Sequence, residues 1–196
     1  MNASARCQFP QLKPRVGYAV TGHIRSSSTP MSKRCYYEAM DWWTYLVRLP
    51  APRFVVLKDA DHVPGLGAFL GEIHANIATA LGCTACVTNG AVRDLPGIAA
   101  TGLQVFAGNV SVSHAYAHIV DFGEPVEIAG LVIKPGDLLH GDQHGVHVIP
   151  ASIAEDLPRA AAEMLADEKE LIEFCRSSQF SLENLAERIN RKSQSC

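Results

Sequence analysis

The chain has 196 residues, of which 47% are hydrophobic and 19% are charged, and its formal net charge is −3. This length and composition are typical of one globular domain with a sizeable core. The negative charge and the lack of a block rich in Lys and Arg argue against a nucleic-acid-binding surface, so we expect no direct nucleic-acid partner.

Six scattered cysteines, with no signal peptide and no apolar run of transmembrane length, indicate a cytoplasmic protein without a membrane partner. Cys83 and Cys86 form a C-x-x-C motif, which suits redox chemistry or half of a zinc site. The motif lies inside an apolar, strand-like run and has no second pair at zinc spacing. We therefore interpret both cysteines as buried structural thiols.

The first third of the chain predicts a strand, a helix and a second strand. Residues 1–14 are polar and proline-containing, so we expect a loose lead-in to the strand at residues 15–24. Residues 26–29 followed by Pro30 predict the start of a helix that ends before Pro50. Apolar and aromatic residues at helical spacing predict one face packed in the core or at a subunit interface, namely Tyr36, Met40, Trp43 and Val47.

A strand at residues 53–58 leads into a polar turn and a glycine-rich loop. Asp59, Asp61 and His62 carry metal-ligand chemistry, but we favour a solvated polar turn. The loop cannot be a dinucleotide fingerprint, because position 70 is Leu where a third glycine is needed. We therefore expect no nucleotide site.

Residues 71–94, GEIHANIATALGCTACVTNGAVRD, are the most informative stretch of the chain. Its apolar residues from Ile73 to Leu81 recur at helical intervals, and Gly82 ends the predicted helix. Gly71 and Glu72 then stand at the helix start, where unpaired backbone N–H groups and the helix dipole favour a carboxylate or phosphate.

Arg93 and Asp94 follow the next predicted strand, residues 83–88, at the end where ligands bind in open α/β sheets. Arg93 can take a carboxylate bidentately, and Asp94 offers oxygen ligands to a divalent cation such as Mg²⁺. The alternative is a surface turn with a local ion pair, since such pairs are common and weak.

The rest of the chain predicts a strand at residues 103–106, a β-rich unit at 125–149 and helices at 153–176 and 182–189. His114 and His118 can share a metal only if their segment is helical, and we favour loop histidines that border the pocket. A later group of possible zinc ligands consists of His140, Asp142, His144 and His147. We favour a structural role over a zinc site, because neighbouring side chains of a strand point to opposite faces.

Taken together, the motifs resemble the RraA-like family, which includes regulators of ribonuclease E activity and class II 4-hydroxy-4-methyl-2-oxoglutarate aldolases. The similarity covers roughly residues 15–175. The matching segments are VGYAVT at 16–21, Gly71-Glu72, NGAVRD at 89–94, VFA at 105–107, IAGLVIKPGDLL at 128–139 and DQHGVHVIP at 142–150. The resemblance implies a single-domain α/β fold of the swivelling β/β/α type, with a central mixed sheet and flanking helices. We assign residues 1–14 to the lead-in, 15–176 to the domain and 177–196 to a C-terminal helix and tail.

The resemblance also implies a divalent-metal-dependent lyase that cleaves a C–C bond in a 2-oxo acid through a pyruvate enolate. The substrate is then a 4-hydroxy-4-methyl-2-oxoglutarate-type acid, cleaved by retro-aldol reaction, or oxaloacetate, cleaved by decarboxylation. Asp94 is the implied ligand of Mg²⁺ or Mn²⁺, Arg93 holds the substrate, and the backbone of Gly71, Glu72, Ile73 and His74 completes the cradle. Glu72 stands where the family usually has Asp. The extra methylene of Glu displaces the carboxylate by about 1 to 1.5 Å, and a displacement of this size can lower the catalytic rate.

Assembly and regulation are the remaining implications of the resemblance. Family members are typically homotrimers, or dimers of trimers, with active sites at subunit interfaces. A neighbouring carboxylate can approach the metal, and the candidates here are Glu168, Glu170 and Glu173. The alternative function is a non-catalytic protein that binds and inhibits ribonuclease E. A methyltransferase, another label given to such sequences, is not expected, because no glycine-rich nucleotide loop joins a strand to a helix.

Overall fold

The computed structural model describes residues 1, 4–30 and 38–193, and its contacts divide the chain into two compact units, Met1–Ala151 and Ser152–Cys196. The sequence placed a division at residue 176 instead. The observed units differ because helix α4 (Leu157–Cys175) belongs with helix α5 (Leu182–Ser193). Among the described residues, none of the helices has the length and apolar character needed to cross a membrane.

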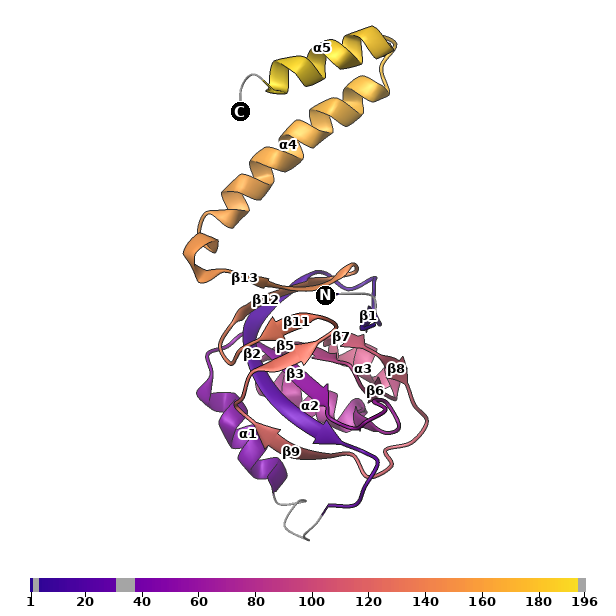
Figure 1. The fold of residues 1–196 in the computed structure, drawn as a ribbon, viewed down its shortest axis with the longest axis vertical. Coiled ribbons are helices and arrows are strands. Elements are labelled where there is room, and N and C mark those ends of the chain that lie inside the picture. Colours follow the sequence, from indigo (N-terminus) through magenta and orange to yellow (C-terminus); the bar gives the residue numbers. More distant parts are fainter. Residues whose placement is uncertain (2–3, 31–37, 194–196) are drawn as a thin grey trace. The chain divides into compact units, whose positions relative to one another are not determined.

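An eight-stranded mixed sheet forms the centre of the first unit (Figure 1). Its order is β1-β7-β5-β3-β2-β12-β13, and β9 pairs with β2 as well. Strands β2, β3, β5 and β7 run parallel, while the other four pair antiparallel. The bounds are β1 (Arg6–Cys7), β2 (Arg15–Arg25), β3 (Arg53–Asp59), β5 (Cys83–Thr88), β7 (Gln104–Ala107), β9 (His118–Phe122), β12 (Leu138–Asp142) and β13 (Gly145–Ile149).

Both faces of this sheet are covered, which explains why its central strands read as continuous apolar runs. Alternate residues of β3 and β5 therefore enter two different core clusters. One cluster holds the inner faces of helices α1 (Glu38–Arg48), α2 (Glu72–Ala80) and α3 (Leu95–Thr101). The other holds residues of the hairpin formed by β10 (Val126–Ile128) and β11 (Leu131–Ile133). The mixed α/β class expected from the sequence is confirmed.

A second, three-stranded parallel sheet places the segments that matter for function. Its order is β4 (Ala68–Leu70), β6 (Ala91–Val92) and β8 (Asn109–Val110). Strand β4 leads directly into α2, and β6 leads into Arg93 and Asp94. Since β4 and β6 are parallel neighbours, their ends lie side by side.

The N-terminal segment is not the loose lead-in that the sequence predicted. Residues 6–7 pair with β7, and Ala5 and Phe9 are buried. Gln104, which is itself buried, donates from Nε2 to the carbonyl of Phe9 at 2.9 Å. The segment is therefore an edge strand that closes the core.

Helix α1 buries a different face from the one predicted. Trp42 and Leu46 are fully buried, whereas Met40 and Val47 are 65% and 44% exposed. The predicted stripe was wrong because the buried side chains lie one position away along the same helical spacing. Tyr36 and most of the predicted first turns lie outside the described residues.

The serines predicted to start helix α1 hold a neighbouring loop instead. The backbone N–H and hydroxyl groups of Ser26 and Ser27 all donate to the carboxylate of Asp61, at 2.6 to 3.0 Å. The described part of α1 begins at Glu38.

The second unit is a pair of helices, as predicted. Pro158 lies in the first turn of α4, and Phe174 is the buried residue of that helix. The guanidinium of Arg188 lies 4.5 Å from the centre of the Phe174 ring and Arg188 Nη1 is 2.7 Å from Glu170 Oε1. These contacts join α4 to α5.

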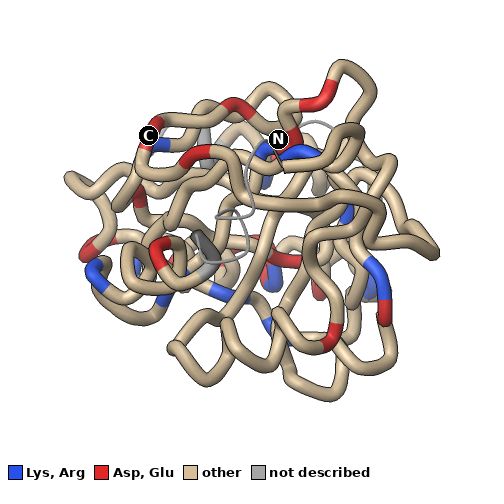
Figure 2. The backbone as a smooth tube through the Cα atoms, turned by 90° about the horizontal axis from the view of Figure 1, so that it is seen from below, with Lys and Arg blue, Asp and Glu red and all other residues tan. Residues whose placement is uncertain are grey.

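Charged residues are mixed over the described backbone rather than gathered by sign (Figure 2). Lys and Arg segments alternate with Asp and Glu segments in that view.

Candidate active site

The Arg93–Asp94 pair lies against the start of helix α2. The backbone N–H of Arg93 donates to the carbonyl of Leu70 at 3.1 Å, which fixes the end of β6 beside the end of β4. Asp94 Oδ2 lies 3.3 Å from Arg93 Nη1 and 3.4 Å from the backbone nitrogen of Glu72. The structure thus brings together the guanidinium, the carboxylate and the helix start that the sequence singled out.

Gly71 permits this close approach. Its backbone is extended, with φ −132° and ψ −168°, so its conformation alone does not require glycine. A Cβ atom at this position would lie 2.7 Å from Asp94 Oδ2 and 3.3 Å from Arg93 Nε. Any side chain at position 71 would therefore push the Asp94 carboxylate out of place.

The first turn of α2 has donors to spare. The N-cap residue Gly71 has no side chain to cap the helix, the Glu72 N–H donates to Asp94 Oδ2 at 3.4 Å, and the first intrahelical bond runs from Ala75 N to Gly71 O at 3.0 Å. The N–H groups of Ile73 and His74 lie ahead of that bond and point out of the helix start. This turn therefore suits an anionic group, as the sequence predicted.

Asp94 has an uncommon backbone conformation that directs its side chain toward α2. Its φ of 54° and ψ of 42° lie in the left-handed region, which few residues other than glycine adopt. It occupies the N-cap position of α3, yet its side chain makes no capping bond to that helix. Such strain persists where surrounding structure enforces it, often at functional sites.

Arg93 keeps one buried donor without an acceptor. Its side chain is 35% exposed and that of Asp94 is 39% exposed, so a ligand can reach both. Within the described residues, Arg93 Nε is buried and has no hydrogen-bond partner. A buried N–H without an acceptor is costly, and the carboxylate of a small ligand would satisfy it.

Glu72 turns toward helix α3. A Cβ atom at Gly97 would lie 2.5 Å from Glu72 Cδ and 2.7 Å from its Oε2, so the Glu72 side chain rests on the Gly97 backbone. The sequence did not reveal Gly97 as part of the site. The available signal was a glycine inside a helix, which usually has a packing reason.

His74 contributes its backbone to the helix start, while its ring packs among aromatic side chains. The ring centre lies 4.6 Å from that of Phe69 and 6.2 Å from that of Trp43. Burial, together with the nearby charges of His114 and Arg93, lowers the pKa of His74 to about 4. His74 is therefore neutral at physiological pH. The sequence analysis did not predict that Phe69 and Trp43 pack around its ring.

The other candidate ligand groups do not gather into a cluster of metal ligands within the described residues. Among the described residues, no group of three or more His, Cys, Asp or Glu side chains can hold a metal ion. The residues before His118 form a loop, and β9 begins at His118, so His114 and His118 do not share a helical face. Asp59 is buried rather than solvated, and it accepts bonds from Gly65 N at 2.8 Å and Asp61 N at 3.0 Å.

The histidines of the β12–β13 hairpin make pairwise contacts. His140 and His147 are cross-strand partners with ring centres 5.0 Å apart, and His144 lies 3.4 Å from Asp142. Burial and the neighbouring His140 lower the pKa of His147. These contacts agree with the structural interpretation that the sequence favoured over zinc.

Cys83 and Cys86 are free and buried. Burial raises the pKa of Cys83 to about 12 and raises that of Cys86 still further. A thiol that does not ionise is a poor nucleophile and a poor metal ligand. Both are structural, as predicted.

The site is suited to a divalent cation held by one protein carboxylate. Mg²⁺ commonly keeps several waters and binds one or two carboxylates together with its substrate. Asp94 Oδ1 has no hydrogen-bond partner within the described residues, and the Asp94 side chain is 39% exposed, so a hydrated ion can reach it. The donor set therefore fits such an ion, although the described residues supply a single ligand.

Comparison with known proteins gives the family. A family model described as RraA-like, Aldolase/RraA, matches residues 2–148, which includes every residue of the candidate site. The chain belongs to the RraA-like family. The resemblance noted from the sequence is thereby confirmed.

Relatives of this RraA-like protein carry different names. It is 31% identical over 155 residues, 79% of this chain and 68% of the other, to the Halalkalibacterium halodurans protein named "Putative 4-hydroxy-4-methyl-2-oxoglutarate aldolase". Its fold is similar to that of an uncharacterised Pseudomonas syringae protein, with TM-score 0.70, 23% identity and coverage of 93% and 79% of the two chains. It is also similar to Streptomyces coelicolor RraAS2, described as an unusual member of the RNase ES inhibitor RraA family, with TM-score 0.62, 22% identity and coverage of 89% and 81%.

Proposed function

We propose that this RraA-like protein is a divalent-metal-dependent lyase that cleaves 2-oxo acids to pyruvate. The substrate is a 4-hydroxy-4-methyl-2-oxoglutarate-type acid or oxaloacetate. The observation that supports this most is the convergence of Arg93 and Asp94 on the start of α2. The name of the H. halodurans relative agrees with the same chemistry.

Substrate binding falls to Arg93 and the first turn of α2 in this proposal. The unpartnered Nε and the adjacent Nη groups of Arg93 bind the substrate carboxylate. The N–H groups of Ile73 and His74 stabilise negative charge that develops on the substrate during C–C cleavage. Neither task requires a protein nucleophile.

Asp94 holds Mg²⁺ or Mn²⁺ in this proposal. When bound, such a cation acts as a Lewis acid that polarises the 2-oxo group and favours the enolate. The ion pair with Arg93 orients the Asp94 carboxylate. Glu72 lies close by on Gly97 and is the second carboxylate of the site.

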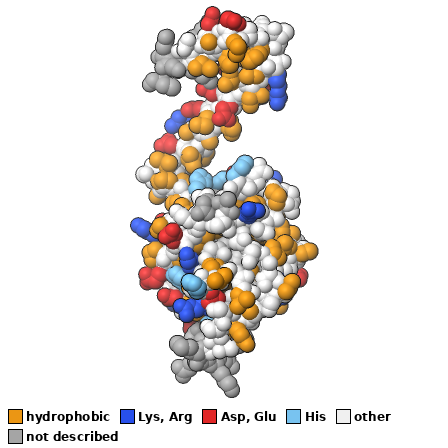
Figure 3. Space-filling view, turned by 45° about the vertical axis from the view of Figure 1, so that its right-hand side comes forward, with side chains coloured by type: hydrophobic (Ala, Val, Ile, Leu, Met, Phe, Trp, Pro, Cys, Tyr) orange, Lys and Arg blue, Asp and Glu red, His pale blue; other side chains and the backbone are white. Residues whose placement is uncertain are grey.

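A trimer with sites at its interfaces is part of the proposal. Ile73 is 72% exposed and Val110, whose strand β8 pairs with β6, is 53% exposed. Large apolar side chains around a site favour an interface, and Figure 3 shows others on the same unit. Of the candidate neighbour carboxylates, Glu170 pairs with Arg188 and Glu173 lies 3.9 Å from Lys169, whereas Glu168 has no recorded ion pair within the described residues.

The test is release of pyruvate from both substrates, with and without Mg²⁺ or Mn²⁺. Asp94→Asn should abolish metal-dependent turnover and weaken Mn²⁺ binding, measured by electron paramagnetic resonance. Asp41→Asn is the matched control, because Asp41 is an exposed carboxylate on α1. Equal turnover by wild type and Asp94→Asn would refute the proposal.

The alternative is a protein that binds ribonuclease E without catalysis. Two observations favour it. RraAS2 is described as a member of an RNase inhibitor family, and this chain has Glu72 where the family usually has Asp. Pull-down with a ribonuclease E domain and inhibition of RNA cleavage would support this function. It becomes the better proposal if none of the 2-oxo acids is turned over and the ribonuclease is bound.

A further inference from the structure

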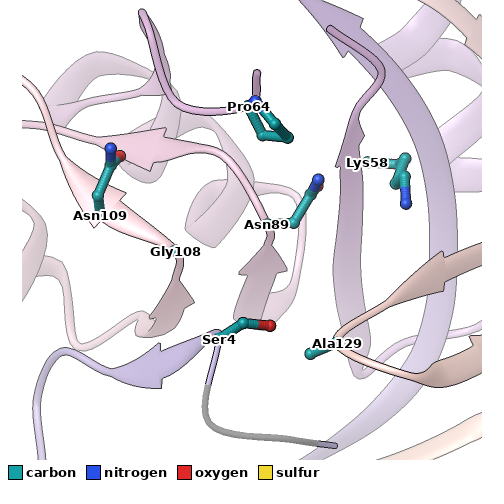
Figure 4. Close-up of a pocket in the computed structure, with 7 residues that line it drawn as sticks. All are labelled: Ser4, Lys58, Pro64, Asn89, Gly108, Asn109 and Ala129. Atoms are coloured by element: carbon teal, nitrogen blue, oxygen red, sulfur yellow. The ribbon is translucent and has the colours of Figure 1, made fainter. Parts of the chain in front are cut away.

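A cavity separate from the candidate active site lies at the carboxyl-terminal ends of the parallel strands β3, β5 and β7. It has a volume of about 370 Å³, and its lining residues include neither Arg93 nor Asp94. Lys58 comes from the end of β3, Asn89 follows β5 and Gly108 follows β7. Figure 4 shows Asn89 between Lys58 and Asn109, with Ser4 and Pro64 on opposite sides of the space. This volume is in the range of small-ligand pockets.

Two amide side chains in this cavity have fixed orientations. Asn89 accepts from the backbone N–H of Asp59 at 2.7 Å through Oδ1 and donates to the carbonyl of Asp59 at 3.0 Å through Nδ2. Asn109 donates through Nδ2 to the carbonyl of Gly65 at 3.3 Å. Each amide nitrogen carries two hydrogens and uses one of them here, so each retains one donor.

Lys58 brings a positive charge to the same cavity. Its Nζ donates to the carbonyl of Glu127 at 2.6 Å, which uses one of three N–H bonds. Among the described residues, no carboxylate lies within ion-pair distance of this ammonium group. None of the residues that line the cavity is acidic. The lining therefore combines one cation that forms no ion pair within the described residues with several spare donors.

We propose that this cavity binds a small oxyanion, with Lys58 supplying the charge and Asn89 and Asn109 supplying N–H donors. Phosphate and the carboxylate of a short organic acid share the required chemistry, since both accept several charge-assisted hydrogen bonds. Strand β6 lies between Asn89 and Arg93, so this site and the candidate active site are neighbours along one strand but have different lining residues.

Titration of the ¹⁵N-labelled full chain with inorganic phosphate, and separately with pyruvate, tests the proposal at constant ionic strength. The amide signals of Asn89, Gly108 and Asn109 should shift with a saturable dependence on the anion. Lys58→Gln should weaken binding about tenfold or more, because it removes the charge and keeps a donor. Asn109→Asp should weaken it as well, because it adds a negative charge.

Two controls separate this site from others. Lys134→Gln removes the same charge from an exposed turn and should leave the affinity unchanged. Arg93→Gln should leave phosphate binding at the cavity intact even if it abolishes turnover, so failure of the lyase proposal does not affect this test. The anion that binds with the higher affinity shows whether the ligand of this cavity is a phosphate or the carboxylate of a short organic acid.

Two results would overturn the inference. One is that neither anion shifts these amides in a saturable way. The other is that Lys58→Gln binds as tightly as wild type while remaining folded by circular dichroism.

Discussion

The neutral, partly buried His74 predicts a measurable loss of stability in mild acid. Its pKa is about 4 in the folded chain, against an ordinary value of 6.5, so the unfolded chain takes up a proton more readily. Stability from this residue is complete above pH 6.5 and falls as the pH decreases toward 4. At pH 5 the linkage relation gives a loss of about 2 kcal/mol, and below pH 4 the loss levels off at about 3 kcal/mol.

The informative variant is His74→Phe, which keeps an aromatic ring between Phe69 and Trp43 but cannot titrate. Urea unfolding, followed by tryptophan fluorescence at pH 8, 6.5 and 5, gives the free energy of unfolding for both proteins. Any difference at pH 8 reports packing alone. Between pH 8 and pH 5, wild type should lose about 2 kcal/mol more than the variant.

His62→Asn is the matched control, because His62 is exposed in the β3–β4 loop and should leave the pH dependence unchanged. The reasoning fails if the curves of wild type and His74→Phe run parallel from pH 8 to pH 5. It also fails if the variant is the more acid-sensitive of the two.

Three further predictions follow from packing. Gly71→Ala should leave unfolding nearly unchanged while reducing pyruvate release on the order of 10- to 100-fold, because its Cβ displaces the Asp94 carboxylate; full activity would contradict this. Trp42→Ala should lower the free energy of unfolding by about 3–5 kcal/mol in urea titrations, since the ring is fully buried, and a loss under about 1 kcal/mol would argue against that burial. Iodoacetamide followed by peptide mass mapping should label exposed Cys175 in the native protein and label Cys83 only after unfolding; rapid native labelling of Cys83 would refute its burial.

Local patterns predicted the framework of the site well. Helical spacing from Ile73 and the apolar run at 83–88 place α2 and β5 close to their observed bounds. Arg93 and Asp94 were assigned to the end of a strand, and the structure has them directly after β6. These features depend on short segments, where periodicity and turn residues carry the information.

Long-range contacts were the part that sequence could not give. The proximity of Gly97 to Glu72 and the ring contacts of His74 depend on how α2 and α3 pack, which no local pattern encodes. The buried face of α1 was misassigned because Trp42 and Trp43 are both large and aromatic. The edge strand at residues 6–7 has little apolar character, and pairing with β7 explains its order.

The three-stranded sheet has a consequence for how the protein folds. Its strands come from residues 68–70, 91–92 and 109–110, so their alignment requires two loop closures of about twenty residues each. Contacts between distant segments form late and slow folding. The chain loses entropy when each loop closes, before the new contacts contribute stabilising free energy. A refolding chain should therefore regain helical signal first, and ligand binding should return only with the final cooperative phase.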